Sequence, residues 1–141
     1  ITWDELKNTS DNILITTACL AGILCKCSEE AKNDVIEFIK NNKHRCFLEV
    51  QHHMSLEQCE YNRYLWKLSK QYGIPMIAGT DTHSLDDFTA ELRLVMQKAK
   101  GISFPNEDVL DLRFKTYDEL CFSYKKQGSL PEEVWRDTIS V

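Results

Sequence analysis

Residues 74–84 read IPMIAGTDTHS, and the fold that we predict for the rest of the chain is built around them. A short apolar run ends at Gly79, and Asp81 and His83 follow one residue apart before a helix begins. Alternate residues of an extended chain point the same way, so both side chains can approach one object from the same side. A carboxylate beside an imidazole, just past a buried strand, suits a metal site or an acid–base pair.

The bulk properties describe an ordinary globular domain. The 141 residues suffice for one domain with a real core, and 43% apolar with 28% charged residues is typical of soluble proteins. No apolar run approaches the roughly 20 residues that span a bilayer, and no signal peptide is visible. The net charge of −5 argues against binding nucleic acid through a bulk basic surface. Because the first residue is Ile1 rather than Met, we expect a piece of a longer protein.

Six cysteines are many for this length. Without a secretory signal they are predicted to be reduced thiols of a cytoplasmic protein, with Cys46 and Cys59 buried. Cys19, Cys25 and Cys27 cluster in sequence, but they lack paired C-x-x-C half-sites and a nearby histidine, which disfavours a structural zinc knuckle.

Three segments read as short buried strands: residues 12–17, 45–51 and 74–79. Single helical stretches separate them, so the strands must run parallel with right-handed crossovers. The three strand-to-helix corners then lie at one edge of the sheet, where α/β folds carry their sites. Cys19, the corner at 51–53 and the Asp81/His83 pair would all face that edge. Three strands cannot close a barrel, so further strands are expected from a missing N-terminal part.

Capping patterns predict where the helices begin. The expected N-caps are Thr2, Ser28, Ser55, Ser84, Thr116 and Ser129. The helix after Ser55 should end at Gly73 and bury a stripe of Tyr61, Leu65, Leu68 and Tyr72. The helix after Ser84 should bury Phe88, Leu92, Val95, Met96 and Ala99 and stop at Gly101. Residues 102–115, which include Pro105-Asn-Glu-Asp108, show no clear period and are predicted to be a connecting loop.

Three further polar residues are secondary site candidates. Glu49 lies among apolar strand residues, where a carboxylate needs a partner or an altered pKa. We favour a structural pairing for Glu49 over a catalytic role. His52 and His53 follow the same strand, and in such a loop they are expected to be exposed or capping rather than ligands.

The order and the residues of these motifs resemble those of a known family. The segments FLEVQHH (47–53), Glu57-Gln58, 68–73 and IPMIAGTDTH (74–83) are similar to the PHP (polymerase and histidinol phosphatase) domain of bacterial DNA polymerase III alpha subunits. Upstream, ITTACLAG (15–22) resembles that family's strand ending in a Ser-Gly-Cys-type corner. The tail, LRFKTYDEL (112–120) and LPEE (130–133), is similar to the segment leading into the polymerase core.

The resemblance implies an α/β fold: the C-terminal part of a distorted (β/α)7 TIM-like barrel over residues 1–101, followed by a loop and helical extension over 102–141. It also implies a trinuclear cluster of zinc, manganese or magnesium at the strand ends. By motif match, three ligand positions fall on Cys19, Asp81 and His83. The remaining ligands, including an opening His-x-His pair, would lie outside this chain.

The resemblance implies a function at the level of a longer parent protein. The parent would be a DNA-directed DNA polymerase of replication that contacts DNA, a proofreading partner and other replisome subunits, with no membrane. Its PHP domain would carry a 3′–5′ exonuclease or serve structure and partner binding. The alternative is a free-standing PHP phosphoesterase acting on a small phosphate. A non-enzymatic interaction module would also describe these 141 residues, which by themselves should catalyse little.

Overall fold

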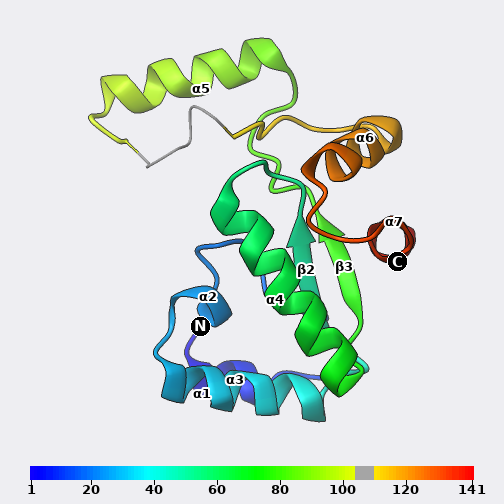
Figure 1. The fold of residues 1–141 in the computed structure, drawn as a ribbon. Helices are drawn as coiled ribbons and strands as arrows, with labels where there is room; N and C mark the ends of the chain where they lie inside the picture. Colours follow the sequence, from blue (N-terminus) through cyan, green and yellow to red (C-terminus); the bar gives the residue numbers. More distant parts are fainter. Residues whose placement is uncertain (104–109) are drawn as a thin grey trace.

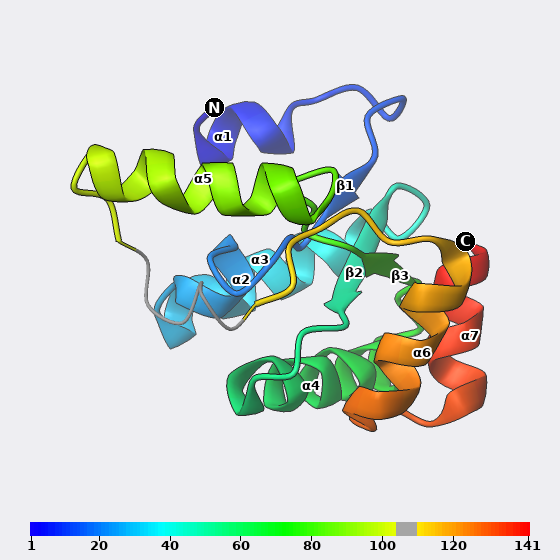
Figure 2. The ribbon, with the colours of Figure 1, turned by 90° about the horizontal axis from the view of Figure 1, so that it is seen from above.

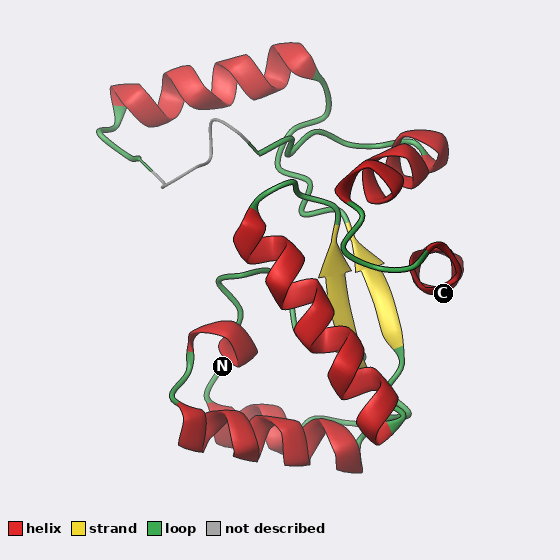
Figure 3. Cartoon of the chain, in the orientation of Figure 1, coloured by secondary structure: helices red, strands yellow, loops and turns green. Residues whose placement is uncertain are grey.

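The structure, a computed structural model, describes residues 1–103 and 110–141. In this part of the chain helices and strands alternate through the first three quarters and helices complete the C-terminus (Figures 1 and 3). The elements are α1 (Trp3–Lys7), β1 (Ile15–Thr16), α2 (Ile23–Lys26), α3 (Glu29–Asn41), β2 (Cys46–Gln51), α4 (Leu56–Tyr72), β3 (Met76–Gly79), α5 (Asp87–Ala99), α6 (Tyr117–Gln127) and α7 (Glu132–Ser140).

The three strands form one parallel sheet in the order β1-β2-β3, as the sequence predicts. Glu49 pairs with Ile77 and Gln51 with Gly79, so the ends of β2 and β3 are level. The strand predicted over 12–17 is shorter than expected, because only Ile15 and Thr16 pair with β2.

The two faces of the sheet differ in their covering. Cys46, Leu48 and Val50 are buried, whereas the alternating Phe47 and Glu49 are only partly covered. The buried face belongs to one core that receives apolar side chains from α3, α4, α6 and α7. Figures 1 and 2 show α4 across this face and α7 beside β3. A sheet with helices on one face and a partly open second face is compatible with part of a barrel.

Most of the predicted helix starts are confirmed. Thr2 and Thr116 form complete capping boxes with Glu5 and Glu119, and the Ser28 side chain accepts the N–H of Ala31. A cap of this kind satisfies one of the N–H groups that a helix leaves free at its start.

The starts of α5 and α7 differ from the prediction. Asp86, not Ser84, caps α5, because Ser84 instead forms a bridge with Arg113. Pro131 precedes α7, while the hydroxyl of Ser129 turns back to the side chain of Gln127 at 2.6 Å. The short helix α2 was not predicted.

Helix α4 follows its prediction closely. Ser55 Oγ accepts the N–H of Gln58, and Gly73 ends the helix in the left-handed conformation at φ 64°. Tyr61, Leu65 and Leu68 are buried along the expected stripe, and Tyr72 is half-buried.

The prediction for α5 is wrong in its central point. Phe88, Leu92, Val95, Met96 and Ala99 were expected to be buried, and all five are exposed. The spacing of the apolar residues is helical, as predicted, but no other element of the described chain covers that face. Of the loop predicted over 102–115, residues 104–109 lie outside the described residues. Among the described helices, none has the length and apolar character to cross a membrane.

A buried amide network fixes the C-terminal end of β2. Asn62 on α4 has no exposed surface; its Oδ1 accepts the N–H of Gln51 at 3.2 Å and its amide donates to the Gln51 carbonyl at 2.8 Å. Gln58 donates to the same Asn62 oxygen at 2.9 Å, and Gln127 on α6 donates to the Gln51 carbonyl at 3.0 Å. The network ties the sheet edge to two helices.

Replacing Asn62 with Ala should lower the free energy of unfolding by about 2–3 kcal/mol, because the buried backbone groups of Gln51 lose hydrogen bonds that water cannot replace. Urea unfolding measures this loss. Asn33→Ala, at an exposed position of α3, is the matched control and should stay within about 0.5 kcal/mol of the parent. Equal stabilities of the two variants would contradict the role assigned to Asn62.

Candidate functional site

The ends of all three strands meet at one cavity of about 430 Å³. Cys19 reaches it from the corner after β1, His53 from the corner after β2, and Asp81 and His83 from the corner after β3. The three side chains that the sequence singled out therefore line one cavity, with His53 as a fourth.

Two of these corners depend on unusual backbone. Ala18 and Asp81 have φ of 56° and 49°, in the left-handed region that residues other than glycine seldom adopt. Each lies at a strand end, directly before or at a residue that lines the cavity. Gly22 completes the first corner, because a Cβ there would lie 2.3 Å from the carbonyl oxygen of Thr17. Such conformations cluster at functional sites.

Asp81 is the centre of the charged contacts. Its carboxylate lies 3.6 Å from His53 Nε2 and 3.8 Å from His83 Nδ1, distances of ion pairs rather than of formed hydrogen bonds. His83 Nδ1 lies 2.7 Å from the backbone oxygen of Asp81. The His53 ring, and then the charge of His83, hold the pKa of Asp81 below its usual value against the opposing effect of burial. Asp81 is thus an anion presented to the cavity.

His52 and His53 are buried, contrary to the expectation that they would be exposed or capping. Their exposed fractions are 3% and 4%, and their ring centroids are 4.6 Å apart. Neither ring makes a hydrogen bond to a described residue. They are buried because the Asn62 network draws the end of β2 under α4 and α6, a long-range effect that no local pattern shows.

Glu49 has the structural pairing that was favoured for it. Its carboxylate accepts the hydroxyl of Thr16 at 2.7 Å and the side-chain amide of Gln51 at 2.9 Å, which links β1 to β2. Gly79 leaves the room for this arrangement, since a Cβ there would lie 2.0 Å from Glu49 Oε1. Glu49 does not line the cavity at the strand ends.

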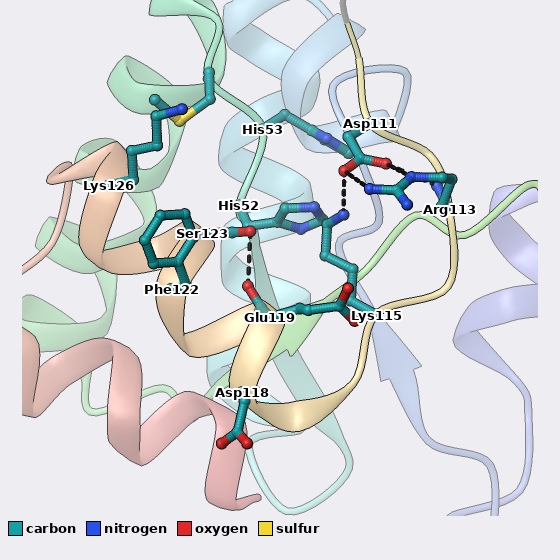
Figure 4. Close-up of a pocket in the computed structure, with 11 residues that line it drawn as sticks. His52, His53, Asp111, Arg113, Lys115, Asp118, Glu119, Phe122, Ser123 and Lys126 are labelled. Carbon is teal, nitrogen blue, oxygen red and sulfur yellow. Dashed lines mark hydrogen bonds and ion pairs between the residues drawn. The ribbon is translucent and has the colours of Figure 1, made fainter. Parts of the chain in front are cut away.

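A second cavity, of about 510 Å³, is lined by His52 and His53, so that His53 borders both cavities (Figure 4). Three of its charges are paired with one another: Arg113 donates twice to Asp111 at 2.9 Å, and the buried Lys115 donates to the same carboxylate. Arg113 and then Lys115 hold the pKa of Asp111 well below its usual range. This cluster was not predicted from the sequence, although the alternation of an acid at 111 with bases at 113 and 115 was a possible signal.

The donor atoms at the first cavity fit a divalent metal in their chemistry. Thiolate, carboxylate and imidazole all bind zinc, and carboxylate and imidazole also suit manganese. Their arrangement is incomplete, however. Within residues 1–103 and 110–141, no group of three or more His, Cys, Asp or Glu side chains is placed to hold a metal ion. The described chain therefore offers converging donors rather than a finished metal site.

Comparison with known proteins adds one relative. The chain is 29% identical to the DNA polymerase III subunit alpha of Borreliella burgdorferi (strain ATCC 35210 / DSM 4680 / CIP 102532 / B31), and the match covers 92% of this chain. The chain spans only 12% of the length of that relative. No family model matches the chain.

Stability should fall as the pH is lowered through the titration of His52. Burial lowers the pKa of His52 from about 6.5 to about 4, and the charges of His53 and Lys115 act in the same direction. At pH values between these two pKa values, His52 binds a proton in the unfolded chain but not in the folded chain. Neutral His52 contributes on the order of 3 kcal/mol to the free energy of unfolding. This contribution is fully present above about pH 6.5 and is lost as the pH falls towards about 4.

Urea unfolding at pH 7 and pH 4.5 measures this loss in the parent chain and in His52→Phe. The phenylalanine keeps a buried aromatic ring beside Tyr124, whose ring centroid lies 6.3 Å from that of His52. Because Asp81 and Asp111 also favour the fold at higher pH, some pH dependence should persist in the variant. A variant with the full pH dependence of the parent would refute the role given to His52.

Proposed function

We propose that this chain is part of the PHP domain of a bacterial DNA polymerase III alpha subunit. The observation that carries the proposal is the meeting of Cys19, Asp81 and His83 at one cavity, at the positions where the resemblance expects metal ligands. The similarity to the Borreliella burgdorferi subunit supports it, because it runs along 92% of the chain. DNA-directed DNA polymerisation would then be carried out by other parts of the longer protein.

The partly open face of the sheet supports the proposal that these three strands are part of a barrel. In a barrel of parallel strands the helices cover the outside, and inward-pointing side chains of successive strands fill the centre. Here the helices cover the face of Leu48 and Val50, and the opposite face carries Phe47 and the paired Glu49. We assign this second face to the interior of a (β/α)7 barrel whose other strands lie elsewhere in the longer protein.

Cys19, Asp81 and His83 would be ligands of a divalent metal cluster, zinc, manganese or magnesium, in the complete domain. Such metals polarise phosphoryl oxygens and generate hydroxide for phosphodiester hydrolysis, which at a DNA 3′ end is an exonuclease reaction. In this account His53 keeps Asp81 ionised and held in place. Orientation of a ligand by such a neighbour changes metal affinity about tenfold to a hundredfold.

Two other functions remain as candidates. A free-standing phosphoesterase would not need the C-terminal segments 112–120 and 130–133, which resemble the segment that leads into a polymerase core. A structural role, such as holding a proofreading subunit, is favoured by the incomplete arrangement of donors in the described chain. Activity in the presence of metal separates the free-standing phosphoesterase from the other two, because only the phosphoesterase should be active as this chain alone.

The 141-residue chain should show no manganese-dependent trimming of DNA 3′ ends above background, because an incomplete ligand set binds metal weakly and positions it poorly. The measurement is a time course on a 3′-recessed duplex with a labelled 5′ end. The same assay on a small phosphate monoester tests the phosphoesterase alternative.

Asp81→Asn is the matched variant for both assays, since it keeps the size of the side chain and removes its charge. Trimming of DNA that requires manganese and is lost in Asp81→Asn would show that the chain holds a finished nuclease site. Hydrolysis of the monoester with the same dependence would favour the free-standing phosphoesterase. Either result contradicts the proposal of a partial site.

A further inference from the structure

The exposed side of α5 carries an uninterrupted apolar stripe. Its residues recur with alternating spacings of three and four, the pattern with which helices pack along a shared seam. The exposed fraction is 67% at Phe88, 45% at Leu92 and 62% at Val95. The stripe consists of Phe88, Leu92, Val95, Met96 and Ala99 on the helix, with Leu85 and Ile102 continuing the spacing just outside it.

The opposite side of α5 faces the rest of the chain. Ala90, Arg93 and Leu94 are partly buried and line a cavity together with Leu110 and Leu112. Figure 1 shows the helix set apart from the sheet and from α3 and α4. The apolar stripe is therefore largely open among the described residues, although Leu92 and Met96 border an open cavity that His83 also lines. An apolar patch of this kind marks an interaction surface.

The charges beside the stripe indicate which partner fits. Glu91 and Lys98 are exposed and lie seven residues apart on one edge of the stripe, where Glu91 also borders the cavity under α5. Suppose that two copies of α5 pack antiparallel with Leu92 of one opposite Val95 of the other. Glu91 of each copy then lies beside Lys98 of the other copy. The two-fold symmetry produces two such Glu91–Lys98 ion pairs. A parallel pair would place Glu91 beside the partner's Met96 and satisfy neither charge.

We propose that the α5 stripe is a self-association surface, on which α5 of a second copy of this chain packs antiparallel about a two-fold axis. This inference is independent of the proposed function. Because α5 has only 13 residues, the contact is smaller than a standard stable interface. The dimer is therefore weak, and it forms at high protein concentration.

Sedimentation velocity over a concentration series tests the proposal. The unsubstituted 141-residue chain should shift from monomer to dimer as its concentration rises. Leu92→Asp should abolish the shift, since it places two charges in the seam. Glu91→Lys and Lys98→Glu should each weaken dimerisation about fivefold to tenfold by setting like charges against each other. The double variant Glu91→Lys/Lys98→Glu restores both pairs and should regain the affinity of the parent.

Glu60→Lys, an equal charge change at an exposed position of α4, is the control and should leave dimerisation unchanged. Circular dichroism of each variant verifies that the helices persist. A parent chain that stays monomeric at all concentrations would overturn the proposal and assign the stripe to another partner. A double variant as weak as the single ones would overturn the antiparallel arrangement.

Discussion

The paired hydrogen bonds between the Asn62 side chain and the backbone of Gln51 fix the end of the central strand next to the site. They occupy both polar groups of the last residue of β2 and hold them against α4. Helix α6 fixes the end of β2 at a second point, because the hydroxyl of Tyr124 donates a hydrogen bond to the Val50 carbonyl at 2.7 Å. With this strand end fixed from two sides, the two residues that follow it have little freedom.

That fixed end explains the geometry of the site. His52 and His53 are carried into the interior, where both line the second cavity and His53 also lines the first. His53 comes within 3.6 Å of Asp81, which the left-handed backbone at the end of β3 presents to the same cavity. The charge of Asp81 is therefore set by residues that are 28 and 2 positions away in the sequence but adjacent in space. His53, Asp81 and His83 lie close together because the parallel strands β2 and β3 end at the same level.

The sequence predicted what depends on local or periodic signals. Serine and threonine caps placed most helix starts, and the alternation of strands with long helices predicted the parallel sheet and the meeting of Cys19, Asp81 and His83. It did not predict the burial of His52 and His53, because that follows from Asn62, whose partners lie 11 and 65 residues away. The place of Asn62 on the face shared by Gln58 and Leu65 was a signal that could have been used. For α5 the spacing showed an apolar face but could not show what covers it.

We propose that the three strand ends form one partial metal site. The most direct measurement is the loss of amide signals in the nitrogen–proton NMR spectrum when a small amount of Mn²⁺ is added to the labelled chain. We predict that the signals of Cys19, His53, Asp81 and His83 disappear together before all others, and that Asp81→Asn prevents this. Broadening that begins instead at exposed acidic residues such as Glu132 and Glu133, and leaves the Asp81 region unchanged, would contradict the account.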